Sequence, residues 1–534
     1  MVEIKDLTMR FGKQLLFENV NLSLDKGRRY GLIGANGAGK STLLKILSGQ
    51  IEASSGEILI ESGLKIGVLG QDQFAFESFS VKDAVLYGNK RLYDAVREKT
   101  QLYEAGEFND EINERLGELE MICAEEDPAY EYETRIEKIL SSLGLNDFDK
   151  KMSEIETSDK FKVLLAQVLF PRPDVLFLDE PTNNLDIDAI SWLEFELNRH
   201  TGTLVVISHD RHFLNRVCTD ILDVDFRRVR EFSGNYDDWF IASNLIAKQA
   251  QFEREKKLKE KAELEKFIAR FSANASKAKQ ATSRQKQLDK LDLSELTTSS
   301  RREPSILFKP AREIGNEILE LSGVDMSFGE VQILKNFNLK LAHGDKIAII
   351  GRNGVGKSTL CKIIMGELTP QRGKVHMGAT IEPGYFAQDT NNKISGELKL
   401  YEYLQSPQNR DLDEIRKCLG RMLFSGAEQE KSVGSLSGGE KHRVKHRVML
   451  SKLMLQRPNL LVLDEPNNHL DLEAIIALGE ALYNFAGCAI CVSHDRELID
   501  AFANRILHLK GGGEIVDFRG TYEEYRESLG ASDD

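Results

Sequence analysis

The sequence has no run of apolar residues long enough to cross a membrane, and it does not begin with a secretory leader. A membrane-spanning helix needs roughly 18 or more consecutive apolar residues, and no stretch of these 534 residues approaches that length. In the N-terminal segment MVEIKDLTMRFG the apolar residues alternate as in a strand, without the charged and then apolar segments of a signal peptide. We therefore expect a cytoplasmic protein with no membrane domain of its own.

Cysteine is also scarce. Of six scattered residues, only Cys488 and Cys491 have the spacing of a redox or metal-binding pair, and no second pair completes a zinc site. Because both lie in the apolar run AICVSHD, we interpret them as core residues of a buried strand.

Positive charge is in deficit. Lys and Arg number 71 against 85 Asp and Glu, which gives a formal net charge of −14. This balance argues against nucleic-acid binding over the whole surface, so any such contact must be local. The stretch 245–290 is the exception, because it holds 13 Lys and Arg residues against 6 Asp and Glu, a net charge of +7.

An internal repeat surrounds this basic stretch. The segment GLIGANGAGKST of the first half recurs as AIIGRNGVGKST in the second, and landmarks on both sides keep fixed offsets. An offset of 317 residues separates Lys40 from Lys357, Phe11 from Phe328 and Gln71 from Gln388, whereas 285 residues separate Asp179 from Asp464 and His209 from His494. The first copy therefore contains 32 extra residues, which we place in a helical arm at about 83–132, where charged residues alternate with spaced Leu, Tyr and Ile.

Both copies alternate short Val, Ile and Leu runs with helical patterns. The runs at 30–33, 175–178 and 204–207 are continuously apolar, as in buried parallel strands. We predict an α/β fold with two tandem nucleoside triphosphate-binding domains. Their boundaries are 1–240 and 316–534, and a long α-helical hairpin linker occupies 241–315.

Each copy contains the phosphate-binding pattern G-x-x-x-x-G-K-[ST] between an apolar strand and a helix. Glycines permit a tight loop whose N–H groups surround phosphates at a helix N-terminus. Lys40 and Lys357 would neutralise phosphate oxygens, and the hydroxyls of Ser41 and Ser358 would reach Mg²⁺. Two matches at a repeat offset leave little room for chance.

Further polar residues follow the next strands of each copy. Asp179 and Asp464 end apolar strands and would hold the metal's water shell. The adjacent Glu180 and Glu465 would polarise a water for attack on the γ-phosphate. His209 and His494, each in a Ser-His-Asp-Arg segment after the following strand, would contact the γ-phosphate or orient the glutamate.

With Leu436-Ser-Gly-Gly-Glu440, these motifs resemble those of the ATP-binding cassette (P-loop NTPase) family, in which two cassettes pack head to tail around two ATP molecules with Mg²⁺. The resemblance implies that site one consists of Gly34, Asn36, Gly37, Gly39, Lys40, Ser41, Thr42, Gln71, Asp179, Glu180 and His209 together with the signature residues Ser437, Gly438, Gly439 and Glu440. Site two would combine Gly351, Asn353, Gly354, Gly356, Lys357, Ser358, Thr359, Gln388, Asp464, Glu465 and His494 with the signature position of the first copy. Mg²⁺ ligands would be Ser41, Gln71 and Asp179 in site one and Ser358, Gln388 and Asp464 in site two. Phe11 and Phe328 match the aromatic residue that stacks on adenine, with a strand-core aromatic as the alternative.

The chain departs from that family at three places. The first signature position, 155–160, reads IETSDK, without Ser-Gly-Gly, so we expect site two to be the weaker or slower site. The tandem repeat KHRVKHRV at 441–448 adds four residues, slightly more than one helical turn. The helix face beyond it would rotate by only about 40° and rise by ~6 Å, a displacement that a loop can absorb. Asn467 replaces the usual threonine, which the first copy keeps as Thr182.

Fused cassettes around a basic connector resemble the ABC-F family of ribosome-associated ATPases, most closely its YbiT-like branch. The likeness covers nearly the whole chain and includes FIARFSANASKAKQATSR at 267–284. It implies an ATP-hydrolysing translation factor that binds near the tRNA exit site, with its linker against peptidyl-tRNA and the peptidyl-transferase centre. The implied partners are large-subunit rRNA and an exit-site ribosomal protein, and the implied state is a monomer.

The connector residues agree with RNA contact. Leu264, Phe267, Ile268 and Phe271 form a helical apolar seam, and 272–276 would form the tip. A concentrated basic tip suits phosphate backbones in an RNA groove, and the candidate contacts are Lys266, Arg270, Lys277, Lys279, Arg284 and Lys286.

The residues leave alternatives open. One is an antibiotic-resistance factor of the same family that protects the ribosome. Another is the ATPase subunit of a membrane transporter, which fused cassettes without membrane segments disfavour. The others are a nucleic-acid ATPase that acts away from the ribosome and a solvated coiled-coil linker with no partner.

Overall fold

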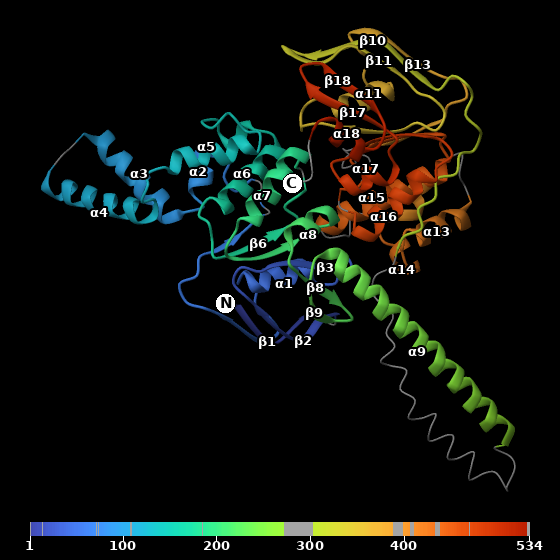
Figure 1. The fold of residues 1–534 in the computed structure, drawn as a ribbon, viewed down its shortest axis with the longest axis horizontal. Helices are drawn as coiled ribbons and strands as arrows, with labels where there is room; N and C mark the ends of the chain where they lie inside the picture. Colours follow the sequence, from blue (N-terminus) through green and yellow to red (C-terminus); the bar gives the residue numbers. More distant parts are fainter. Residues whose placement is uncertain are drawn as a thin grey trace. The chain divides into compact units, whose positions relative to one another are not determined.

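The computed structural model of this chain describes residues 2–12, 14–70, 72, 74–106, 109–183, 185–271, 303–387, 399–405, 411–432, 438–468 and 470–530 (Figure 1). The chain divides into two compact units, 1–61 with 214–301 and 62–213 with 302–534. Each unit is described by itself.

The first unit contains two groups of strands. Its antiparallel sheet has the order β2-β1-β4, with β1 at Val2–Phe11, β2 at Gln14–Leu24 and β4 at Ser55–Ile60. In the other group β3 (Arg29–Gly34) runs parallel to β8 (Asp220–Asp225), which is antiparallel to β9 (Arg228–Ser233). Helix α1 (Lys40–Leu47) follows β3 through the glycine-rich loop.

A single long helix, α9, follows β9 in the same unit. It spans Tyr236–Phe271, 36 residues, and is therefore about 54 Å long. Its first turn is anchored, because Tyr236 and Trp239 are buried and the Trp239 indole N–H donates to the Asp223 carboxylate at 3.3 Å. Beyond this anchor Ile241, Leu245 and Phe252 are more than half exposed. Figure 1 shows α9 leaving β8 and β9 as one uninterrupted helix.

The second copy lies wholly within the second unit. Its main sheet has the order β14-β15-β16-β12-β17-β18, at Pro383–Phe386, Leu460–Asp464, Cys488–Val492, Lys346–Ile350, Arg505–Gly511 and Glu514–Arg519. All neighbours are parallel except β17 and β18. A separate antiparallel sheet has the order β11-β10-β13, at Val331–Lys340, Leu319–Phe328 and Arg372–Met377.

Helices cover this main sheet on both faces. Alternate residues of β12 enter two different hydrophobic clusters, with Ile347 and Ile349 in one and Ala348 and Ile350 in the other, as expected for a strand buried on both faces. The helices are α11 (Lys357–Ile364), α12 (Leu400–Leu404), α13 (Leu412–Arg421), α14 (Gly426–Gln429), α15 (Gly438–Gln456), α16 (Leu472–Tyr483), α17 (Arg496–Phe502) and α18 (Tyr522–Ser528).

The second unit also contains the middle part of the first copy. Three parallel strands have the order β5-β6-β7, at Ile66–Val68, Val175–Asp179 and Thr203–Ile207. The helices here are α2 (Val81–Leu86), α3 (Lys90–Ala105), α4 (Asp110–Glu126), α5 (Tyr132–Ser142), the short η1 (Met152–Glu154), α6 (Thr157–Leu169), α7 (Ile187–Asn198) and α8 (Arg211–Val217).

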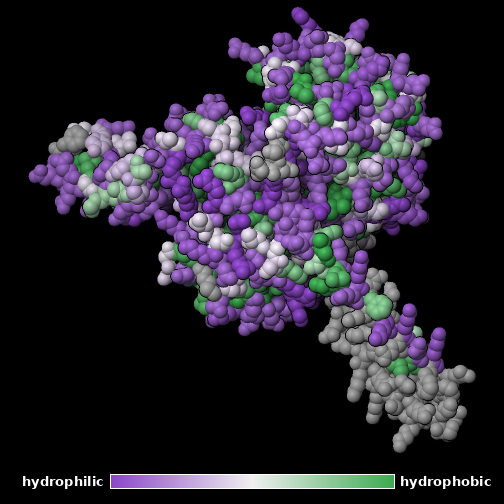
Figure 2. All heavy atoms as spheres, viewed as in Figure 1, coloured by the Kyte–Doolittle hydropathy of each residue, from purple (hydrophilic) through white to green (hydrophobic). Residues whose placement is uncertain are grey.

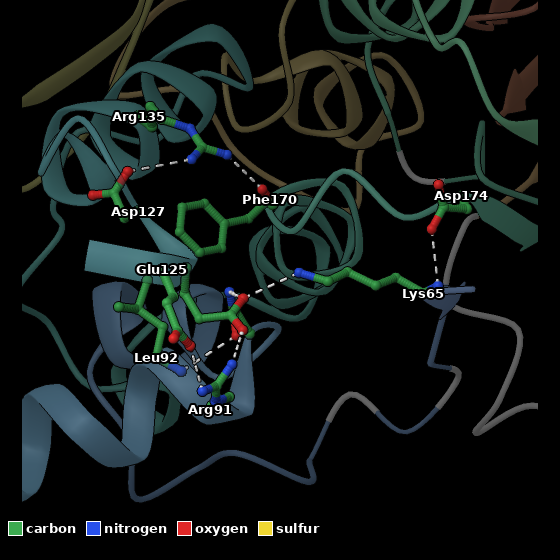
Figure 3. A network of polar contacts seen from close by, with 10 residues as sticks. Lys65, Arg91, Leu92, Glu125, Asp127, Arg135, Phe170 and Asp174 are labelled. Atoms are coloured by element: carbon green, nitrogen blue, oxygen red, sulfur yellow. Dashed lines mark hydrogen bonds and ion pairs between the residues drawn. The ribbon is translucent and has the colours of Figure 1, made fainter. Parts of the chain in front are cut away.

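The arm segment contains α3 and α4, which pack against each other (Figure 1), and its visible surface is mostly hydrophilic (Figure 2). Polar contacts fix its base (Figure 3). Glu126 accepts hydrogen bonds from Lys65, Asn89 and Arg91 at 3.0–3.1 Å. Burial acts to raise the pKa of Glu126, but the bonds from Asn89 and Lys65 bring it below its usual value. The carboxylate is therefore a charged tie at the root of the arm.

The same region is tied a second time. Arg135 donates to the Phe170 carbonyl at 2.7 Å and lies over the Phe170 ring, while its guanidinium is 3.8 Å from Asp127 (Figure 3). These contacts join α5 to the end of α6 and to the end of α4, so the base of the arm is fixed to the helices beside it.

The structure settles three expectations. The α/β class with tandem P-loop domains is confirmed, and the predicted apolar strands are β3, β6 and β7. Cys488 and Cys491 are free and buried in β16, as a core reading requires. The tandem repeat at 441–448 lies inside α15, where its four added residues make slightly more than one helical turn.

Candidate functional site

The two phosphate-binding loops have the same backbone. Gly39 and Gly356 precede α1 and α11 with φ of 103° and 104°, a conformation that side-chain-bearing residues rarely adopt. A Cβ on Gly356 would also lie 2.1 Å from the Ile333 side chain. Only glycine fits here, so the sequence pattern builds a tight loop at a helix N-terminus, which is the arrangement that binds phosphate groups.

Each loop encloses its lysine. The Lys40 ammonium donates to the Gly34 carbonyl at 2.7 Å, and the Lys357 ammonium donates to the Gly351 and Arg352 carbonyls, both at 2.8 Å. Burial lowers the pKa of Lys357 to about 8, while Glu465 and Asp186 act to raise it. An incoming phosphate would restore the full charge of this ammonium, since a nearby anion favours the protonated form.

Two of the three residues proposed for Mg²⁺ in the second copy, Ser358 and Asp464, have the chemistry that this ion requires. Asp464 ends β15 and is 1% exposed, and neither carboxylate oxygen has a hydrogen-bond partner among the described residues. Burial raises the pKa of Asp464 to about 6, and Ser358 and Lys357 oppose the rise. A buried carboxylate beside a hydroxyl offers the oxygen ligands that Mg²⁺ prefers.

Both glutamates of the Asp-Glu-Pro motif have left-handed backbones. Glu180 has φ of 52° and Glu465 has φ of 51°. The Glu180 N–H donates to the Ile207 carbonyl at 2.8 Å and the Glu465 N–H donates to the Val492 carbonyl at 3.0 Å. Non-glycine residues in this region cost of order 1–2 kcal/mol and concentrate at functional sites. In both copies the neighbouring strand therefore holds the backbone of the glutamate in this strained conformation.

The two histidines meet their glutamates differently. The His209 ring Nε2 lies 3.3 Å from Glu180, whose other carboxylate oxygen accepts the His209 backbone N–H at 3.2 Å. The His494 ring Nε2 is 3.8 Å from Glu465, and Asn468 donates to Glu465 at 2.8 Å. Burial, followed by Lys357 and Lys162, lowers the pKa of His494 well below its usual value. His494 is therefore a neutral imidazole at neutral pH.

Asn467 preserves the contact that threonine makes in the first copy. The Thr182 hydroxyl lies 3.2 Å from the Ser208 hydroxyl, and the Ser493 hydroxyl donates to the Asn467 side-chain oxygen at the same distance. This bond ties the Asp-Glu-Pro loop to the serine before the histidine, so the substitution does not change the link.

The candidate adenine-stacking residues are exposed. Phe11 and Phe328 end β1 and β10, with 55% and 52% of their surfaces accessible. This exposure excludes the strand-core alternative and leaves each ring accessible for stacking against a planar group.

The signature helices of the two copies begin in register. Helix α6 starts at Thr157 and α15 starts at Gly438, each the third residue of its six-residue signature segment. Helix α6 has 13 residues and α15 has 19, and four of the additional residues are the tandem repeat. The added turn lengthens α15 beyond its start, so the position of the signature at the helix N-terminus is kept.

Contacts between the two copies within the second unit were not foreseen. Asp186 accepts the Asn353 backbone N–H at 3.3 Å, and Asp188 lies 3.1 Å from the Arg352 guanidinium, so both carboxylates hold the second phosphate-binding loop. In the sequence, only their position just after the Asp-Glu-Pro motif marks these two aspartates as candidates for the site.

A second set of contacts joins α7 and α8 to α17. Arg496 is buried, donates to the Ser191 hydroxyl at 2.6 Å, and lies 3.3 Å from His212 and 3.9 Å from Glu194. Arg211, its counterpart at the 285-residue offset, pairs instead with Glu497. The two arginines end the Ser-His-Asp-Arg segments, but only the coordinates reveal their partners.

Several candidate residues cannot be placed. Gln71, Gln388 and Ser437 lie outside the described residues, as do Lys277, Lys279, Arg284 and Lys286. The backbone of Gly438, Gly439 and Glu440 forms the first turn of α15, and Arg270 belongs to α9 without a described side chain. Lys266 is exposed on α9.

Family comparisons agree with these motifs. A family model described as ABC transporter matches residues 17–183 and 334–468, and a second model with that description matches 222–308. The chain is 45% identical over 533 residues to the uncharacterized ABC transporter ATP-binding protein YkpA of Bacillus subtilis (strain 168), covering 99% of this chain and 98% of the relative. It is 43% identical over 534 residues to the probable ATP-binding protein YbiT of Escherichia coli O157:H7, covering 99% and 100%.

Solved structures share the fold. An archaeal ribosome recycling factor, crystallised with a ribosomal stalk protein, matches with a TM-score of 0.62 and 18% identity over 98% of this chain and 92% of that chain. A structure named RNase-L Inhibitor matches with a TM-score of 0.61 and 19% identity over 98% and 93%. Among the described residues of the present chain, no helix is both long and apolar enough to cross a membrane.

Proposed function

Because this chain belongs to the ABC-F family of the ATP-binding cassette superfamily and is an ATPase, we propose that it is a translation factor. It binds the ribosome near the tRNA exit site and places its interdomain linker against the peptidyl-tRNA and the peptidyl-transferase centre. Large-subunit rRNA and an exit-site ribosomal protein are its other contacts, and the protein acts as a monomer in the cytoplasm.

The observation that carries this proposal is α9. A helix about 54 Å long, anchored at its first turn by Trp239, exposes Lys248, Lys256, Lys259 and Lys266. A connector between two domains needs no such length. An exposed basic helix matches the electrostatic demands of a phosphate-rich groove, and the basic residues beyond it extend the same charge. The archaeal recycling factor with the same tandem fold is named for action on ribosomes.

ATP supplies the switch in this proposal. Site one and site two, with the residues assigned from the sequence, each hold MgATP when the cassettes close. The domain boundaries at 240 and 316 separate these two motors from the linker. Bound Mg²⁺ neutralises phosphate charge, Lys40 and Lys357 hold the phosphates, and Glu180 and Glu465 orient the attacking water. Hydrolysis then favours the open form and release.

Ribosome co-sedimentation tests the proposal. The Glu180→Gln/Glu465→Gln double variant removes both candidate bases while it keeps the size and hydrogen-bonding capacity of the side chains. It should pellet with ribosomes in MgATP and stay in the supernatant with ADP. A double variant that remains in the supernatant with ATP would overturn the proposal.

Two controls separate the competing functions. The same variant tested against free duplex DNA shows whether it binds nucleic acid away from the ribosome. Drug susceptibility on overexpression distinguishes a ribosome-protection factor, because only that factor restores growth in antibiotics that act at the peptidyl-transferase centre. Neutralising Lys277, Lys279 and Arg284 should weaken the effect on translation and spare ATP hydrolysis by the free protein. Unchanged translation would demote the tip to a spacer.

A further inference from the structure

A buried lysine lies on the helix whose signature has degenerated. Lys162 is in the second turn of α6, and its side chain is 5% exposed. Its ammonium lies 3.4 Å from Asp159 and 4.0 Å from Asp186. Charge-assisted hydrogen bonds are about 2.7–2.9 Å long, so Lys162 is held between two carboxylates with no close bond to either one.

In the second copy the corresponding cation forms a short ion pair. Arg447 occupies the same place at the 285-residue offset, and its guanidinium lies 2.6 Å from Asp471, the counterpart of Asp186. Arginine presents a planar fork fixed by its partner, whereas lysine is a point charge on a flexible stem. The copy with Ser-Gly-Gly thus uses its cation in a structural pair, and the copy without it keeps a looser cation.

Lys162 lies beside the phosphate-binding loop of site two. The Asp186 oxygen that faces Lys162 is the oxygen that accepts the Asn353 backbone N–H. Lys162 is therefore a buried cation separated from this loop by one carboxylate.

A loosely held ammonium beside the loop can turn toward an incoming anion, because a nearby phosphate favours the charged form of a lysine. Terminal phosphate oxygens carry the charge that distinguishes ATP from ADP at this position.

We propose that Lys162 is a phosphate-binding residue of site two, where it gives the γ-phosphate of ATP the positive charge that replaces the missing Ser-Gly-Gly. The inference rests on the assignment of site two made under Proposed function. On nucleotide binding the ammonium shifts from Asp159 toward the phosphate and remains beside Asp186.

Nucleotide titrations of the full chain test this. A Lys40→Met background removes the lysine of site one, so ATP and ADP binding with Mg²⁺ report site two. Lys162→Gln should lower the affinity for ATP about tenfold, which is the cost of one lost charge-assisted hydrogen bond. It should change the affinity for ADP less than about twofold. Lys162→Arg keeps the charge and should restore ATP affinity to within about threefold.

The matched control is Arg447→Gln in the same background. Arg447 is the counterpart of Lys162 in the second copy, and its guanidinium already lies 2.6 Å from Asp471. Its loss should leave the ratio of ATP to ADP affinity at site two unchanged. Equal weakening of ATP and ADP by Lys162→Gln, or no weakening of ATP, would show that Lys162 is structural.

Two further variants keep the test decisive. Asp159→Asn removes a competing carboxylate at a partly exposed position, so it should tighten ATP without changing ADP, even if Lys162→Gln does not fold. Unchanged or weaker ATP binding by this variant counts against the proposal. The Lys40→Met/Lys357→Met double variant should bind no ATP. If it still binds ATP, the assignment of site two itself is wrong, whatever Lys162 does.

Discussion

The switch histidines of the two copies share a motif but not an environment. In the first copy the side chain of His209 is 22% exposed and close to Glu180, whereas in the second His494 is 11% exposed, neutral and farther from Glu465. The strained glutamates and the bond to Thr182 or Asn467 are kept in both. Duplication has therefore preserved the positions of the reactive carboxylates and allowed their surroundings to diverge.

Turnover should reveal the largest difference between the copies. Glu180→Gln removes the candidate base of site one, which has the intact signature, and should lower the kcat of the free protein about 100-fold. Glu465→Gln acts on site two and should lower it less than about threefold. Steady-state phosphate release measures both, with nucleotide binding as the control for folding. Equal losses would show that the degenerate signature does not slow site two.

The two arginine contacts between copies should differ in stability. Arg496 is buried against Ser191 and Glu194, so Arg496→Ala leaves a buried carboxylate and should cost about 3 kcal/mol. Arg211 and Glu497 are each about one-third exposed, and Arg211→Ala should cost less than about 1 kcal/mol. Urea unfolding of the nucleotide-free protein compares the variants. Similar losses would mean that burial does not separate these two contacts.

The strand-end aspartates should respond differently to pH. The folded pKa of Asp464 is about 6, above its unfolded value, so its contribution to stability is present below the unfolded pKa and lost as pH rises through about 6. Asp464→Asn should therefore stabilise the metal-free protein at pH 7.5. Its melting temperature should rise, and its unfolding free energy should increase by up to about 3 kcal/mol. This increase in stability should become smaller toward pH 4.

Asp179→Asn is the matched variant, because Asp179 ends the equivalent strand and is only partly buried. We expect a smaller gain from it over the same pH range. Melting curves in EDTA between pH 4 and pH 8 compare the two variants. A stability increase for Asp464→Asn that grows as pH falls would contradict the raised pKa of Asp464.

Exchange of the loop-tying residues should have the smallest effect. Thr182→Asn and Asn467→Thr each retain a side-chain oxygen for the neighbouring serine, so each should change the unfolding free energy by less than about 0.5 kcal/mol. Thr182→Ala and Asn467→Ala remove it and should each cost about 1 kcal/mol. If exchange costs as much as truncation, the two bonds are not equivalent.

The features that were predicted from the sequence are those that depend on short, local patterns. Continuous apolar runs located β3, β6 and β7, and the glycine spacing located loops with the required positive φ at Gly39 and Gly356. Family likeness gave the rest of the nucleotide-site assignment, which the variants above test.

What the sequence could not predict depends on residues far apart in the chain. Ser191 and Arg496 are 305 residues apart, and no periodicity connects them. The bond from Ser493 to Asn467 makes an apparent departure from the motif harmless, but only the geometry of two loops reveals it. The position of the repeat at 441–448 inside α15 also comes from the coordinates, because residue count alone does not separate a longer helix from a longer loop.

The extended α15 indicates how this chain tolerates changes in length. Four residues add a little more than one turn, so residues beyond the repeat return to nearly the same angular position after a rise of about 6 Å. Deletion of 445–448 would restore the shorter spacing with the apolar face still directed at the core. Deletion of two residues would rotate that face by about 160°. Along this helix, only insertions and deletions of about a whole turn keep the apolar face directed at the core.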